Sequence, residues 1–213
     1  MIELRWGVSE LIAQRRFWLL LAAVIVAGVL VFIFAGGGSG DEIDSLRESA
    51  NIPALAEIVK SAPPEKARRA LWAISQVGGP EAAKPLHEAT QAPDWKVREV
   101  AVLTLPIVTR RKHIDELADL LKNDPAPQVR AAAATALGQV YACKKVPELV
   151  DSLSDKDPLV QQQAKWAVVR ICGVEPGYES PAEAAKHQQK YYTSYWNIYG
   201  KTITRYHEVH NKR

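Results

Sequence analysis

The stretch Asp124-Pro-Ala-Pro-Gln-Val129-Arg130-Ala-Ala-Ala-Ala-Thr-Ala-Leu137-Gly138-Gln139 decides the fold. An acidic residue and two prolines come first, followed by strong helix formers with apolar residues at helical spacing. Asp in a turn is suited to cap the helix that follows, and Pro is tolerated in the first helical turn. The stretch therefore predicts a short turn followed by a helix.

The same pattern occurs four times along the chain. Ala67, Val97, Val129 and Val160 occupy equivalent positions, at spacings of 30, 32 and 31 residues. Another helix start precedes each of them, at residues 52–55, 84–87, 113–117 and 146–149, and Pro opens this helix in three of the four cases. Repeated helix pairs of this length are typical of an α-solenoid. We therefore predict an all-α fold in which residues 52–173 form a solenoid of about four helix pairs.

Residues 124–139 resemble a HEAT repeat, and the stretch from 52 to 172 is similar to HEAT-like repeats such as those of phycobilin lyases. The resemblance implies a ladder in which a turn Asp of one unit meets an Arg from the second helix of its neighbour. The matching positions are Asp94, Asp124, Asp155, Asp157, Arg68, Arg98 and Arg130. The end units depart from the pattern, as terminal repeats are expected to do: residues 62–64 contain no Asp, and Gln161 replaces the Arg.

An uncharged apolar run occupies residues 17–35, and its 19 residues would span roughly 28 Å as a helix. A secretory signal has a shorter apolar region and a small-residue cleavage site, so a retained single-pass transmembrane helix is the favoured interpretation. Arg15 and Arg16 precede the run, whereas Asp41 and Glu42 follow it. The positive-inside rule then places residues 1–16 in the cytoplasm and the solenoid in the periplasm or an equivalent space. Residues 36–51 are expected to form a glycine-rich linker and a short helix leading into the solenoid.

The C-terminal segment, residues 174–213, is rich in aromatic residues. Ser180-Pro181 opens a helix on which Tyr192, Tyr195, Trp196 and Tyr199 recur at helical spacing. We expect this helix to cap the last repeat, to dock a partner, or to do both on opposite sides. A basic tail follows from residue 201, and we expect its His207 and His210 to be solvated rather than half of a metal site, because structural zinc needs four ligands.

Stacks of HEAT type bind partners through their concave face or their free end. The predicted partner-binding residues are Arg98, Arg130 and Lys165 on the second helices, and Tyr195, Trp196 and Tyr199 on the aromatic helix. Trp72 and Trp166 fall among the apolar positions of second helices, where filling the core is a better explanation than stacking on a ligand.

Two cysteines, Cys143 and Cys172, lie near the ends of neighbouring second helices. Helices packed side by side could bring the two sulfur atoms together, and an oxidising compartment would allow a disulfide. The alternative is a pair of buried free thiols, which behave as small apolar side chains.

Catalytic and nucleotide-binding motifs are absent from the sequence, and no residue can be assigned to catalysis, a cofactor or a metal. A net charge of +3 is too weak to indicate nucleic-acid binding, and the basic run Arg110–His113 is explained by a nearby helix C-terminus. We therefore expect a membrane-anchored scaffold or adaptor rather than an enzyme, an accessory subunit that contacts other proteins of a membrane complex and has no small-molecule substrate. The alternative is a lyase-like enzyme or maturation factor acting on a membrane-associated partner.

Overall fold

The computed structural model describes residues 38–175 and 181–210 of the chain. The chain divides into two compact units, residues 1–45 and 46–213, and helix α2 (Gly38–Glu48) crosses from one to the other. This helix begins inside the stretch that the sequence predicts to be a glycine-rich linker. The predicted cytoplasmic segment 1–16 and transmembrane helix 17–35 lie outside the described residues. Among the helices that are described, none combines the length and apolar character that a bilayer crossing requires.

Residues 46–213 contain the predicted solenoid, and the described part of this unit is helical with no strand. Its four helix pairs are α3 (Ile52–Ser61) with α4 (Pro64–Val77), α5 (Pro80–Ala89) with α6 (Trp95–Thr109), α7 (Ile114–Asn123) with α8 (Pro127–Gln139), and α9 (Val146–Asp151) with α10 (Pro158–Cys172). Two short 3-10 helices, η1 (Cys143–Lys145) and η2 (Ser152–Ser154), flank α9, and α11 (Pro181–His210) follows the last pair. The predicted all-α solenoid of four helix pairs is confirmed.

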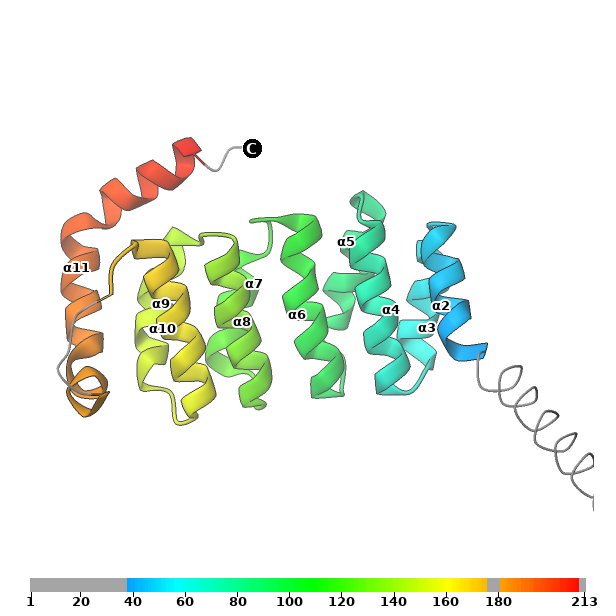
Figure 1. The fold of residues 1–213 in the computed structure, drawn as a ribbon, viewed down its shortest axis with the longest axis horizontal. Coiled ribbons are helices and arrows are strands. Elements are labelled where there is room, and N and C mark those ends of the chain that lie inside the picture. The colour runs from blue at the N-terminus through cyan, green and yellow to red at the C-terminus, as the bar shows by residue number, and fades with distance from the viewer. Residues whose placement is uncertain (1–37, 176–180, 211–213) are drawn as a thin grey trace, which may run out of the picture. The chain divides into compact units, whose positions relative to one another are not determined.

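Within this unit the second helices of the pairs, α4, α6, α8 and α10, stand side by side in one row, and the first helices form a second row behind them (Figure 1). Each second helix contacts its own first helix, and α4, α6 and α8 each contact the second helix of the next pair. This arrangement lets every pair bury its apolar stripe against its neighbours, which is how a solenoid builds a continuous core.

The helix starts follow from capping side chains and prolines. Asn51 accepts a hydrogen bond from Ala54 N (3.2 Å) at the start of α3, and Asp94 accepts from Lys96 N (2.8 Å) at the start of α6. One predicted start is wrong: α5 begins at Pro80, so Pro85 lies inside the helix rather than in its first turn. The reason is that Gly79 and Pro80 already supply a turn and a first helical position.

The core consists of small and branched aliphatic side chains between the two rows. Close packing is tightest at Gly138 of α8, where an added Cβ would lie 2.8 Å from Ala167 Cβ and 2.9 Å from Ala167 Cα on α10. The prediction that Trp72 and Trp166 fill the core is wrong, because 43% and 40% of their surfaces are exposed. The small residues bring neighbouring second helices so close together that a large ring at these positions is left on the surface.

Candidate interaction surface

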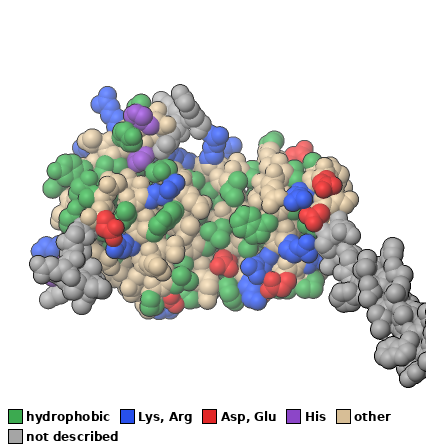
Figure 2. All heavy atoms as spheres, viewed as in Figure 1, with side chains coloured by type: hydrophobic (Ala, Val, Ile, Leu, Met, Phe, Trp, Pro, Cys, Tyr) green, Lys and Arg blue, Asp and Glu red, His purple; other side chains and the backbone are tan. Residues whose placement is uncertain are grey.

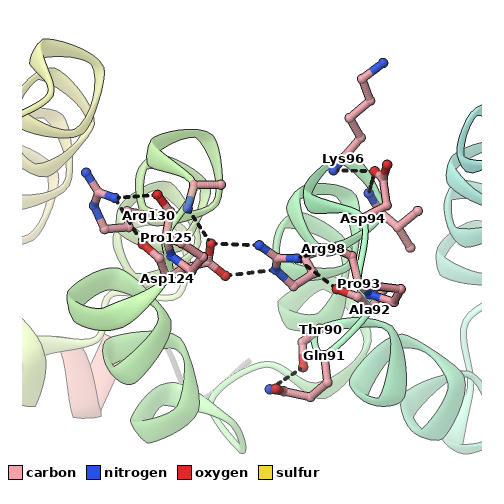
Figure 3. Close-up of polar contacts among 12 residues, drawn as sticks. Thr90, Gln91, Ala92, Pro93, Asp94, Lys96, Arg98, Asp124, Pro125 and Arg130 are labelled. Carbon is pink, nitrogen blue, oxygen red and sulfur yellow. Dashed lines mark hydrogen bonds and ion pairs between the residues drawn. The ribbon is translucent and has the colours of Figure 1, made fainter.

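A ladder of buried ion pairs joins neighbouring units and fixes their spacing. Arg98 on α6 donates two hydrogen bonds to the carboxylate of Asp124 in the next unit, from Nε (2.9 Å) and Nη2 (3.0 Å). Its remaining nitrogen, Nη1, donates to the carbonyls of Ala92 and Pro93 in its own turn (2.9 and 3.0 Å), as Figure 3 shows. The planar guanidinium thus binds two units at once, which the fork geometry of Arg permits.

Arg130 on α8 repeats this arrangement one unit further. Its Nε and Nη2 donate to the carboxylate of Asp155 (2.9 and 2.8 Å), and its Nη1 donates to the carbonyl of Asp124 (3.0 Å). The hydrogen bonds from the guanidinium hold the pKa of the Asp155 carboxyl below its usual range, and the same pair raises the pKa of Arg130. The ladder that the sequence resemblance implies is therefore present at Arg98 and Arg130.

The predicted acidic positions divide into two kinds. Asp94 and Asp157 accept hydrogen bonds from N–H groups in the first turn of α6 and of α10, so they are helix caps. Asp124 and Asp155 also accept from the N–H two residues further on, but that N–H lies in the turn before the helix, and their carboxylates meet the Arg of the preceding unit.

In the two end units, the residues at the Arg position of the ladder bond within their own unit. Gln161 Nε2 donates to the carbonyl of Asp155 (2.6 Å), six residues earlier, as Arg98 and Arg130 donate to carbonyls six residues earlier in their own units. Gln161 therefore keeps the bond within its unit and lacks the fork that would reach a following unit. At the other end, Arg68 Nη1 donates to Glu65 of its own helix (3.0 Å).

The predicted partner-binding residues on the second helices are already engaged within the protein. Arg98 and Arg130 keep only 12% and 4% of their side-chain area exposed, so a partner could reach these guanidinium groups only by displacing a ladder bond. The Lys165 side chain on α10 is more exposed, and its Nζ lies 2.6 Å from Glu175 Oε1. A role of these three residues in partner binding stays a prediction.

The inner side of α11 covers the end of the last unit. Tyr192 is fully buried in the core, and Trp196 and Ile203 pack against the same core. Further along the helix, His207 is buried with its Nε2 3.0 Å from the carbonyl of Ile171, and its ring lies 4.6 Å from that of Tyr141. α11 therefore has the cap function that every solenoid end needs.

Among the described residues, the predicted solvated tail from residue 201 is right for His210, which is exposed, and wrong for His207, which is buried. α11 continues through Gly200 to His210, and His207 is held against the end of α10. His210 bonds to the carbonyl of Tyr206 (2.8 Å) on its own helix instead of meeting His207 at a metal. The predicted role of the basic run is partly right: Arg111 Nε donates to the carbonyl of Val140 (2.9 Å), which is the C-cap of α8 and not of α6.

The outer side of α11 carries an aromatic groove, which we define by its lining residues. They are His187, Lys190, Tyr191, Ser194, Tyr195, Ile198 and Tyr199, and they line an open groove of about 450 Å³. The rings of Tyr191, Tyr195 and Tyr199 follow one another at centroid distances of 6.1 and 4.8 Å. Ile198 and Tyr199 are 69% and 49% exposed, and Figure 2 shows hydrophobic side chains gathered over α11 at the left of the view.

The structure thus separates the three predicted aromatic residues. Tyr199 lines the aromatic groove and is exposed, and Tyr195 lines the groove while it also packs partly against the core. Trp196 packs inward, with its indole ring 2.8 Å from where a Cβ on Gly200 would lie. Ile198 was missed by the sequence analysis, although its position three residues after Tyr195 puts it on the same helix face. Burial raises the pKa of Tyr195, so its phenol is neutral at physiological pH and suits an apolar contact.

Cys143 and Cys172 are both buried free thiols in the structure. They belong to the same core cluster, and burial raises the pKa of Cys172 to about 12. At that value the thiol is protonated and inert as a nucleophile at neutral pH. A disulfide between the two cysteines stays a prediction.

Comparison with solved structures finds a similar fold in the complex of CpcE and CpcF of phycocyanin lyase from Nostoc sp. PCC7120. The match has 23% sequence identity and a TM-score of 0.50, and it covers 66% of this chain and 88% of that chain. The expectation that this protein is not an enzyme is corrected by this finding, because a solved structure with the same fold is that of a lyase complex. At this identity the similarity concerns the fold alone. Comparison with curated proteins finds no match.

A family profile described as HEAT repeats matches residues 52–138 and 114–186. The two matched segments overlap, and together they cover the four helix pairs and the start of α11. They also include both Arg–Asp bonds of the ladder. The chain therefore belongs to the HEAT-repeat family.

Proposed function

We propose that this protein is a scaffold or adaptor that docks another protein on the aromatic groove of α11. The observation that carries the proposal is the division of labour on one helix. Tyr192 and Trp196 cap the solenoid on the inner side, Tyr195 packs partly against the same core while it lines the groove, and Ile198 and Tyr199 remain exposed on the outer side. A helix that serves only as a cap does not require exposed apolar side chains such as Ile198 and Tyr199. Tyr is also enriched in the centres of protein interfaces.

We further propose that the scaffold is tethered to a membrane by residues 17–35, with the solenoid on the extracytoplasmic side, and that its partners belong to a membrane complex. Support comes from the length of the uncharged run and from the arginines before it. A tether raises the effective concentration of a docking surface near membrane partners, so a modest groove is sufficient for stable association.

The test is a variant that removes the outer aromatic face and keeps the cap. Ile198→Ser combined with Tyr199→Ser should leave the melting temperature nearly unchanged, because both side chains are exposed. Loss of two central interface side chains should reduce recovery of stoichiometric partners from mild detergent by at least about tenfold. Quantitative mass spectrometry of the tagged full-length chain measures this recovery.

Leu159→Ser is the matched control, since Leu159 is an exposed apolar residue on α10 that does not line the aromatic groove. It should retain the partners that the wild-type chain recovers. Equal recovery with the double variant and the wild type would contradict docking through α11. Equal loss in the control and in the double variant would mean that surface hydrophobicity in general, and not this groove, retains the proteins.

A second candidate function is a lyase-like or maturation role on a membrane-associated partner. It is favoured by the similarity of the fold to a phycocyanin lyase complex. The two candidates differ in what purifies with the chain. A chromophore visible in the absorption spectrum, or turnover of a substrate by the isolated chain, would favour the second candidate over the first.

A further inference from the structure

Two histidines and a glutamate converge where the first helices of the second and third units come together. His87 lies in the last turn of α5, His113 is the residue that precedes α7, and Glu116 lies in the first turn of α7. Glu116 Oε2 is 2.8 Å from His87 Nε2 and 3.2 Å from His113 Nδ1. The three ligand atoms all lie within 4.8 Å of one another, and the two imidazole rings are 4.8 Å apart.

This spacing is close to that of a coordination sphere. Zinc bonds of 2.0–2.2 Å in a tetrahedron place neighbouring ligand atoms roughly 3.4 Å apart. The 3.2 Å distance from Oε2 to His113 is about 0.2 Å short of that value, and the 2.8 Å distance to His87 is about 0.6 Å short of it. Small rotations of two partly exposed imidazole rings are enough to open the centre of the triangle to an ion.

The carboxylate is held in place by a buried neighbour. Thr90 is fully buried at the end of α5, and its hydroxyl proton is shared between Glu116 Oε1, at 2.7 Å, and the carbonyl of His87, at 2.8 Å. This contact occupies one carboxylate oxygen and leaves Oε2 directed at the two histidines. Metal ligands are typically oriented by such an outer partner, which fixes the ligand and lowers the cost of ordering it.

The remaining ring nitrogens suit metal binding as well. An imidazole binds a metal through one nitrogen only when its proton sits on the other, which then needs an acceptor. The His87 side chain is 46% exposed and the His113 side chain is partly exposed, so water can accept a hydrogen bond from the outer nitrogen of each ring. The nearest cation in the sequence, Arg111, donates from Nε to the carbonyl of Val140, the C-cap residue of α8.

We propose that His87, His113 and Glu116 form a binding site for a divalent transition-metal ion, with Zn²⁺ as the best fit. Two imidazole nitrogens and one carboxylate oxygen are a ligand set that suits Zn²⁺. Mg²⁺ and Ca²⁺ suit it less, because both favour oxygen ligands alone. Three protein ligands leave the fourth position open to water or to a donor atom from another molecule. The bound ion links the second and third units of the solenoid.

The test is Zn²⁺ titration of the full-length protein in mild detergent, purified without a polyhistidine tag and monitored by calorimetry. The wild type should bind one ion, and His87→Asn should weaken the binding by at least about 100-fold, since loss of a direct ligand costs more than loss of an outer partner. Thr90→Val, which removes only the outer partner, should weaken it by about tenfold. Co²⁺ substituted into the wild type should give the absorption of a four-coordinate site, and His87→Asn should abolish that absorption.

His187→Asn is the matched control, because His187 is exposed on α11 and is not part of the cluster. It should bind Zn²⁺ as the wild type does. Glu116→Gln is a second ligand variant for the case in which His87→Asn alters the fold, as judged by circular dichroism. The proposal is overturned if the wild type takes up no Zn²⁺, or if the wild type and both ligand variants bind it with the same affinity.

Discussion

At the scale of single residues, the Arg–Asp bonds of the ladder hold the units in register. Arg130 is nearly buried, and every bond of its guanidinium is directed at a carboxylate or a carbonyl of the protein. Removing one member of a buried ion pair leaves the other charge without compensation, which costs far more than the pair itself contributes. Replacing a ladder Asp by Asn, which removes the charge and keeps the shape, therefore tests how much the ladder contributes to the stability of the solenoid.

Asp155→Asn should destabilise the solenoid by about 3 kcal/mol at pH 7. The folded-state pKa of Asp155 is lowered, so its contribution is fully present above the unfolded pKa of about 3.9 and is lost as the pH falls through the folded value. The acid limb of the stability–pH curve should accordingly be flatter in the variant. Urea denaturation between pH 3 and pH 7 (about one unit per step) measures both effects.

Asp119→Asn serves as the comparison, because Asp119 is exposed on α7 and takes no part in the ladder. It should change the free energy of unfolding by less than about 0.5 kcal/mol. A loss below about 1 kcal/mol in Asp155→Asn, with an unchanged acid limb, would contradict the assignment of the ladder as a stabilising feature.

Some of these side-chain contacts can be predicted from the sequence and others cannot. The pairing of Arg98 with Asp124 could be predicted, because both positions recur with the period of the repeat. The cluster of His87, His113 and Glu116 could not be predicted, because the two histidines are 26 positions apart and the three residues follow no local spacing rule. Only the stacking of one first helix beside the next brings them together.

At the scale of helices, packing distance and not helix propensity explains the glycines. Gly138 lies on α8 where α10 passes closest, and its missing Cβ is what allows the approach. Gly200 lies inside α11, where the indole of Trp196 covers it. Glycine weakens helices by about 1 kcal/mol relative to Ala, and the sequence predicts a tail from residue 201. The contact with Trp196 and the bond of His207 to Ile171 explain why the helix continues.

Gly138→Ala should destabilise the protein by about 1–3 kcal/mol despite the better helix propensity of Ala. The new methyl would meet the backbone of Ala167 at 2.9 Å, and a backbone cannot move aside without separating α8 from α10. Thermal and urea denaturation of the purified protein measure the change.

Gly200→Ala is the matched substitution, since its methyl would meet only the side chain of Trp196. A partly exposed indole can shift more readily than a backbone, and Ala gains about 1 kcal/mol of helix propensity, so the destabilisation should be smaller than that of Gly138→Ala. Equal destabilisation by the two substitutions would show that the approach of α8 to α10 is not the limiting contact.

At the scale of the whole molecule, the sequence predicted the solenoid and its two atypical ends because each follows from a period or from its interruption. It did not predict which side of α11 would be free, because that depends on how the helix rotates against the end of α9 and α10. Burial of Tyr192 fixes this rotation and leaves the row of Tyr191, Tyr195 and Tyr199 on the groove side. The candidate docking surface is therefore a product of packing, although its residues could be named from the sequence.

The placement of the solenoid relative to the membrane is the broadest prediction. Arg15 and Arg16 precede the uncharged run 17–35, and acidic residues follow it, so the positive-inside rule puts the C-terminal side outside the cytoplasm. Alkaline phosphatase fused after Arg213 in a bacterial host should be active, because the enzyme requires the oxidising periplasm for its disulfides. A green fluorescent protein fused at the same site should stay dark. Replacing Arg15 and Arg16 by Glu should weaken or invert this result, since the orientation rests on those two cations. Strong fluorescence without phosphatase activity in the unaltered chain would show that the solenoid faces the cytoplasm.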